Sequence, residues 1–168
     1  ARAAGAQIVA VAVHAGDEYV QLPNAQQRSV ATALAQSGLV DLIYGHHVHV
    51  VQPIDKIGDV WVAYGMGNLI HKQHTAAARA ATQAEALATF TFTEGADGRF
   101  HATAAEARPV AMASTTEPLL HTIDLPTLLA DKSLTGARRT AYQAVYDRSV
   151  KALLALGADT KGLTVVKP

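Results

Sequence analysis

Three histidines stand close together where an apolar run ends, in the segment D-L-I-Y-G-H-H-V-H-V-V at 41–51. Imidazole nitrogens bind transition metals, and the chain has no cysteine that could supply thiolate ligands. In extended backbone His47 and His49 project from one face, and His46 projects from the other. The spacing predicts metal binding at His47 and His49, with His46 facing substrate or orienting a ligand. The alternative is that these are ordinary core or surface histidines.

A second polar cluster follows an earlier apolar run. Residues 7–13, Q-I-V-A-V-A-V, are typical of a strand buried on both faces in a parallel sheet, and His14 comes directly after them. A helix is expected over 25–37, because Asn24 and Gln27 form a capping pair and Gly38 follows as a stop. The next expected strand, 40–44, leads into the three histidines.

A strand, helix, strand unit makes the two strands parallel, and the carboxyl ends of parallel strands lie on one edge of a sheet. We therefore expect His14 to meet His47 and His49 in space. A capping or surface role remains the alternative for His14. Glu18 either faces this site or is a solvated surface charge, and the same choice applies to Asp17.

The rest of the chain predicts antiparallel strands followed by helices. Hairpins are expected over 53–63 and 87–107, with 110–112 extending the second, and a helix is expected over 135–156. Asp124 is placed to cap a short turn at 128–130. His71 and His74 are interpreted as mobile surface residues, and 75–86 as a loose linker or flap.

Composition excludes several classes of protein. The 168 residues are 49% hydrophobic and 17% charged, which suits one soluble globular domain or part of one. Fourteen Lys and Arg balance fourteen Asp and Glu, so we expect no binding to nucleic acid. Without cysteine there is no disulfide, and no apolar run reaches the roughly 20 residues of a membrane span.

Three motifs resemble those of the CapA family of capsule (poly-γ-glutamate) biosynthesis proteins. They are His14-x-Gly16-x-Glu18-Tyr19, Gly45-His46-His47-x-His49 and Tyr64-x-x-Gly67-Asn68. The family resembles calcineurin-like metallophosphoesterases, in which two sheets flanked by helices carry a dinuclear metal site at the sheet edge. The resemblance covers about 8–70 well. Ala15 stands where the family usually has tryptophan, and Val48 where it often has proline.

The resemblance implies metal-ligand roles for His14, His47 and His49. The metals would be divalent ions (zinc, manganese or iron), two of them in the intact protein. We place Glu18 and His46 among the catalytic candidates, and a further pair among the substrate-binding candidates: Tyr19 and Asn68.

The expected fold is the C-terminal half of a two-sheet α/β sandwich of metallophosphoesterase type. It would contain a parallel β-α-β unit in a mixed sheet, antiparallel hairpins and a C-terminal helix. Residues 1–113 would form the metallophosphoesterase-like part, and 114–168 a linker and helical segment packed on it. The superfamily's first metal-binding Asp, its Asn-His motif and its bridging carboxylate come from an N-terminal half that this sequence lacks.

The expected function is capsule polymer biosynthesis on a small-molecule or polyanionic polymer substrate, at an extracytoplasmic or envelope location. The alternatives are a non-catalytic subunit that binds polymer or scaffolds membrane-bound partners, and a phosphomonoester or nucleotide hydrolase of the same superfamily. We expect this chain, when isolated, to lack turnover. Its uncovered strand should pair with the missing N-terminal half or with another copy of the chain.

Overall fold

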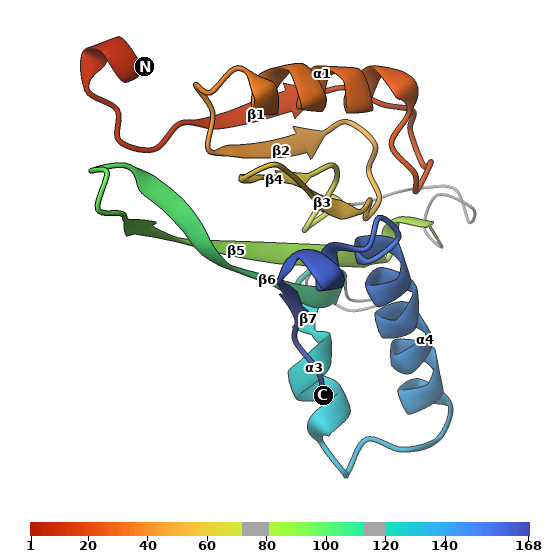
Figure 1. The fold of residues 1–168 in the computed structure, drawn as a ribbon. Coiled ribbons are helices and arrows are strands. Elements are labelled where there is room, and N and C mark those ends of the chain that lie inside the picture. Colours follow the sequence, from red (N-terminus) through yellow and green to blue (C-terminus); the bar gives the residue numbers. More distant parts are fainter. Residues whose placement is uncertain (72–80, 113–119) are drawn as a thin grey trace.

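The computed structural model describes residues 1–71, 81–112 and 120–168. Two β-sheets lie face to face, with one helix above the first sheet and two helices beside the second (Figure 1). The predicted two-sheet α/β architecture is therefore confirmed. In the described parts of the chain, no helix is both long enough and apolar enough to cross a membrane.

The first sheet has the strand order β1-β2-β4-β3. Strands β1 and β2 are parallel, β2 and β4 are parallel, and β3 runs antiparallel to β4. The carboxyl ends of three strands therefore lie along one edge. The four strands are β1 (Ala10–His14), β2 (Leu42–His46), β3 (Ile54–Ile57) and β4 (Val60–Ala63).

Helix α1 (Ala25–Gln36) connects β1 to β2. The expected capping box is present, because Gln27 N donates to Asn24 Oδ1 at 2.9 Å and Asn24 N donates to Gln27 Oε1 at 3.1 Å. These two bonds satisfy backbone and side-chain groups at the helix start. The predicted parallel β-α-β unit is thus observed, and its first and second strands end one and two residues later than expected.

The second sheet is built on a long antiparallel hairpin of β5 (Ala84–Glu94) and β6 (Phe100–Met112). Two short strands join β6, namely β7 (Thr122–Asp124) antiparallel and β8 (Leu163–Val165) parallel. Strand β5 is longer than the sequence indicates, and β6 runs through to 112, as the expected extension at 110–112 predicted. The apolar side of the hairpin faces the first sheet, as alternation along the strands predicts.

The C-terminal part contributes α3 (Leu125–Ala130) and α4 (Gly136–Leu153), which pack on the second sheet. Asp124 is the N-cap residue of α3, but its side chain bonds Arg108 and Thr127 instead of the helix backbone. Because β7 and β8 complete the second sheet, the C-terminal segment forms part of the same core. The division of the chain at 113 and 114 stays a prediction.

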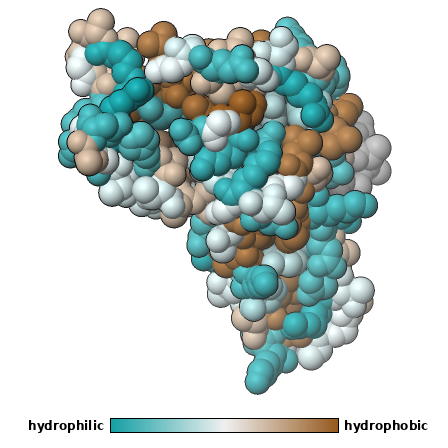
Figure 2. All heavy atoms as spheres, in the orientation of Figure 1, coloured by the Kyte–Doolittle hydropathy of each residue, from teal (hydrophilic) through white to brown (hydrophobic). Residues whose placement is uncertain are grey.

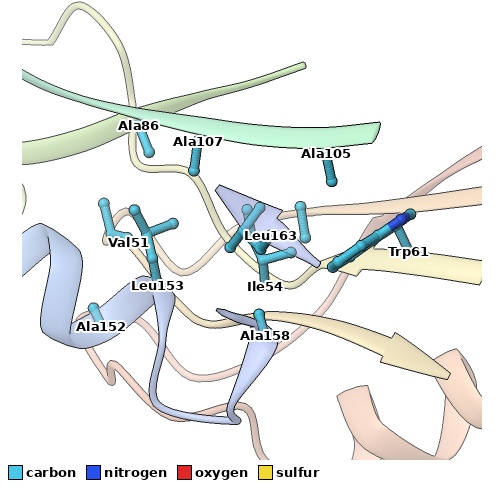
Figure 3. Close-up of a cluster of buried hydrophobic side chains, with 11 residues drawn as sticks. Val51, Ile54, Trp61, Ala86, Ala105, Ala107, Ala152, Leu153, Ala158 and Leu163 are labelled. Atoms are coloured by element: carbon cyan, nitrogen blue, oxygen red, sulfur yellow. The ribbon is translucent and has the colours of Figure 1, made fainter. Parts of the chain in front are cut away.

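The core lies in three layers: one on each side of the first sheet, and a third between the second sheet and helices α3 and α4. Alternate residues of the strands face α1, and the others face the second sheet. Figure 3 shows the layer between the two sheets, where Trp61 and Ile54 meet small side chains of β6. Because Ala105 and Ala107 stand opposite these large residues, the two sheets can approach closely.

Strand β1 differs from the expectation of a strand buried on both faces. Among the described strands it lies at the edge of the sheet and pairs only with β2, and its residues alternate between exposed and half-buried. Large hydrophobic residues near it are also accessible, including Ile8 and Leu39 at 41% and 58% exposure. Hydrophobic and hydrophilic residues are interspersed on the face in Figure 2. The pairing of β1 with a further segment or copy stays a prediction.

The first half of the expected linker at 75–86 lies outside the described residues, as does His74. Its last residues, Ala84 to Ala86, begin β5 and are buried, so that end of the segment is part of the sheet.

We predict that Gly45→Ala lowers the free energy of unfolding by about 3 kcal/mol, because overpacking against backbone cannot be relieved by a side-chain movement. A Cβ atom at position 45 would lie 2.0 Å from the carbonyl oxygen of Tyr64. Gly58→Ala is the control: its φ of 60° is unfavourable, but the space around it is open, so about 1 kcal/mol is expected. Chemical denaturation measures both. Equal losses would contradict the account.

Candidate metal centre

A cavity of about 390 Å³ opens where the loops after β1, β2 and β4 meet. His14 ends β1, and His46 ends β2 and is followed by His47 and His49. The loop after β4 contributes its glycines and Asn68. The register pairs His14 with His46, which brings the two strand ends side by side. The predicted meeting of the two polar clusters at one sheet edge is observed.

Three imidazoles converge on this cavity. The ring centroids of His14 and His47 are 4.7 Å apart, and those of His47 and His49 are 6.4 Å apart. The reason given from the sequence is wrong, however. The strand ends at His46, and His47 and His49 have left-handed φ angles of 93° and 61°. A bent backbone, rather than extended alternation, brings their rings together.

His49 has the most partners in the site. Its Nδ1 lies 2.6 Å from Asn68 Oδ1, and because an amide oxygen only accepts, Nδ1 carries the hydrogen. This arrangement leaves Nε2 with a free lone pair, as a metal ligand requires. Glu18 Oε1 lies 3.9 Å from Nε2, and the Tyr19 ring stacks on the imidazole at 5.8 Å. Thus Glu18, Tyr19 and Asn68 all meet at one histidine.

His46 lies apart from the other three. Its side chain is exposed, and its ring meets Tyr44 edge-on at 5.3 Å. It nevertheless lines the cavity, together with Gly45 and Met66. A position that faces an incoming substrate, as the sequence analysis assigned to it, agrees with this geometry.

Val48 joins the loops of the site. It is 1% exposed, and it packs against Gly16 on one side and Gly65 on the other. A Cβ atom on Gly16 would lie 2.5 Å from Val48 Cγ1, and one on Gly65 would lie 2.7 Å from Val48 Cγ2. In addition, Tyr19 N donates to Val48 O at 2.8 Å. The loops after β1, β2 and β4 are therefore held around one side chain.

The buried side-chain amides of Gln27 and Gln52 hold the loop after β1 in place. Gln27 Nε2 donates to Gln52 Oε1 at 2.8 Å, and Gln52 Nε2 donates to Val20 O at 2.9 Å. Both glutamines are almost fully buried, so these bonds are costly to lose. From the sequence, Gln27 is expected only to cap the helix, and no pattern in the sequence indicates that Gln52 is buried.

The donors suit a divalent transition metal in kind, but they form only part of a site. Three imidazoles and a nearby carboxylate are ligand types that zinc, manganese and iron accept. Within 1–71, 81–112 and 120–168, however, no group of three His, Asp or Glu side chains is placed to hold an ion by itself. His14 and His47 are the closest pair, and further ligands would have to complete their site.

A second polar pair, His71 and Glu85, was not expected from the sequence. His71, interpreted as a mobile surface residue, has a side chain only 8% exposed, and its Nε2 lies 3.5 Å from Oε1 of the fully buried Glu85. That interpretation is wrong. Burial raises the pKa of Glu85 to about 7, against the opposing effect of the backbone N–H groups of Leu69 and Asn68. Alternation along β5 places Glu85 on the same face as exposed Leu87, so no signal in the sequence marks it as buried.

We predict that stability falls with rising pH because of Glu85. The folded state holds the proton up to about pH 7, whereas an unfolded Glu loses it near its ordinary pKa of 4.5. The contribution is therefore full below pH 4.5 and is lost as the pH rises through 7. Between pH 5 and 8 the loss should be about 2 to 3 kcal/mol. Glu85→Gln should remove this dependence in pH-resolved denaturation. Parallel profiles for both proteins would contradict it.

The two sheets, with parallel and antiparallel strands and flanking helices, define a partial α/β domain. Residues 1–73 match the family model described as bacterial capsule synthesis protein PGA_cap. This part of the chain, fewer than half of its residues, is therefore similar to that family.

Two curated relatives support the match. The chain is 36% identical over 98 residues to the PGA biosynthesis protein CapA of Bacillus subtilis (strain 168), which is 58% of this chain and 24% of that protein. It is 37% identical over 68 residues to the capsule biosynthesis protein CapA of Bacillus anthracis, which is 40% of this chain and 16% of that protein. The chain thus spans less than a quarter of the length of these relatives.

Proposed function

We propose that the intact protein is a metal-dependent hydrolase or transferase of phosphoester type that acts in capsule polymer biosynthesis, and that this chain supplies the histidine half of its metal site. The observation that carries the proposal is the convergence of His14, His47 and His49 on one cavity from two neighbouring parallel strands. Ligands commonly bind at this edge of an α/β sheet.

The proposed cofactor is one or two divalent ions, zinc, manganese or iron. When bound, such ions polarise a phosphoryl or acyl oxygen and activate water. His14 and His47 would hold one ion between them, and His49 would offer Nε2, because Asn68 holds the hydrogen on Nδ1. Upstream Asp and Asn residues of the kind that the superfamily uses would complete the coordination.

The other residues of the site would bind substrate and move protons. Glu18 has a half-exposed carboxylate 3.9 Å from His49 Nε2, where it would accept the proton of an attacking water or hydroxyl. Tyr19 and Asn68 would contact substrate at the rim, and exposed His46 would face its polar groups. The proposed substrate is a small molecule or a polyanionic polymer of poly-γ-glutamate type, which we place at the cell envelope with membrane-bound assembly partners.

A non-catalytic role in polymer binding or scaffolding is the second candidate. The observation in its favour is that no three ligating side chains among the described residues form a ready-made metal group. The two functions are distinguished by metal-dependent turnover in the intact protein.

We predict that the intact protein binds zinc or manganese through these histidines. His14→Ala, His47→Ala and His49→Ala should each lower the bound metal content and weaken the apparent affinity at least tenfold, because each removes a ligand nitrogen. Elemental analysis and calorimetric titration measure these quantities. His101→Ala is the matched control, since this exposed histidine pairs with Asp97 on the β5–β6 hairpin. Equal metal content in all variants would contradict the proposal.

We predict that Glu18→Gln in the intact protein lowers kcat at least a hundredfold and leaves the fold unchanged, because it keeps the shape and removes the basic carboxylate. Asp17→Asn is the control. That neighbouring carboxylate bonds Asn24 Nδ2 at 3.1 Å instead of facing His49. Wild-type kinetics in Glu18→Gln would return Glu18 to the role of a surface charge.

A further inference from the structure

The turn that presents Asn68 to His49 rests on a buried carboxylate. Gly67 and Leu69 both have left-handed φ angles, 83° and 63°, and Ile70 N donates to Asn68 O at 2.8 Å. A left-handed leucine is unfavourable by about 1 to 2 kcal/mol, so surrounding contacts must hold this conformation.

Glu85 lies directly against this turn. A Cβ atom on Gly67 would lie 3.0 Å from Glu85 Cγ and 3.2 Å from Glu85 Cβ, so backbone and side chain are in close contact. The next residue, Ala86, donates its N–H to Met66 O at 3.0 Å. The start of β5 therefore packs against the turn and holds it in place.

The carboxyl group of Glu85 is buried and has few polar partners. Glu85 is 0% exposed, and neither carboxylate oxygen completes a hydrogen bond within the described residues. The backbone N–H groups of Asn68 and Leu69 nevertheless lie close enough to favour its ionised form. Burying a carboxyl group that lacks hydrogen-bond partners is costly, which indicates that Glu85 has a structural role at this position.

His71 holds Glu85 from the other side. Its Nε2 lies 3.0 Å from Thr82 O, and because a carbonyl oxygen only accepts, Nε2 carries a hydrogen. His71 Nε2 also lies 3.5 Å from Glu85 Oε1. His71 N also donates to Met112 Sδ at 3.3 Å, which fixes the backbone of His71 against β6. The chain of contacts thus runs from β6 through His71 and Glu85 to the turn.

We infer that Glu85 and His71 are positioning residues, which hold the Gly67–Leu69 turn so that Asn68 keeps His49 in the Nδ1–H tautomer. They lie outside the cavity and contact none of the imidazoles proposed as ligands. Their effect reaches His49 only through Asn68. The inference goes beyond the proposed function, because it concerns the state of His49 before any metal binds.

Long-range proton–nitrogen NMR of the intact, metal-free protein tests this directly, because it reports which nitrogen of His49 carries the hydrogen. The wild type should show His49 with hydrogen on Nδ1. Glu85→Ala should give a mixture of tautomers, as should Asn68→Ala, which removes the acceptor itself. Glu85→Gln keeps an acceptor oxygen and the shape of the side chain, so it should retain the wild-type signal.

Leu125→Ala is the control for general loss of packing, because Leu125 is also 0% exposed but belongs to the cluster beside α3 and α4. It should leave the His49 tautomer unchanged. If Glu85→Ala does not fold, His71→Ala gives the same test and should shift the tautomer in the same direction. An unchanged Nδ1–H signal in whichever of these two variants folds would overturn the inference. That result would leave the proposed metal site untouched, since no metal is present in the measurement.

Discussion

The packing of Val48 between Gly16 and Gly65 is the contact on which the geometry of the site depends. It places a branched apolar side chain where three loops meet, with no room for a Cβ on either glycine. The two residues that flank it, His47 and His49, take left-handed conformations that are unfavourable by about 1 to 3 kcal/mol each. Burial of Val48 and the bond from Tyr19 N offset that cost. The strain is therefore located at the ligand candidates, where a bent backbone directs two rings into one cavity.

The rest of the fold supplies rigidity beneath this contact. The second sheet packs on the first through small residues opposite Trp61, and the Gln27–Gln52 pair ties the loop after β1 to the core. Asn68, which orients His49, stands on a turn supported by β5 of the second sheet. Each sheet thus positions a different part of the site. Strand β1 lies at the edge of the first sheet, beside β2, whose end carries the clustered histidines.

The sequence predicts the elements better than the details of the site. The helix at α1 and the parallel strands beside it follow from a capping box and two apolar runs, which are local signals. The bend after His46 does not follow from alternation, because it depends on Val48 fitting between glycines far apart in the sequence. In the sequence, His71 resembles a surface histidine because its neighbours along the chain are polar. Its contact is with Glu85, which lies further along the chain in β5. Long-range contacts of this kind leave no periodic pattern.

The central claim is that imidazoles from two strand ends bind one metal site, and X-ray absorption of the zinc-loaded intact protein tests it most directly. Histidine ligation gives nitrogen at about 2.0 to 2.1 Å, together with the characteristic outer scattering of imidazole carbons. The account predicts at least two imidazoles per zinc in the wild type, and fewer in a protein with His47 replaced. A spectrum with oxygen ligands alone and no imidazole scattering would contradict it.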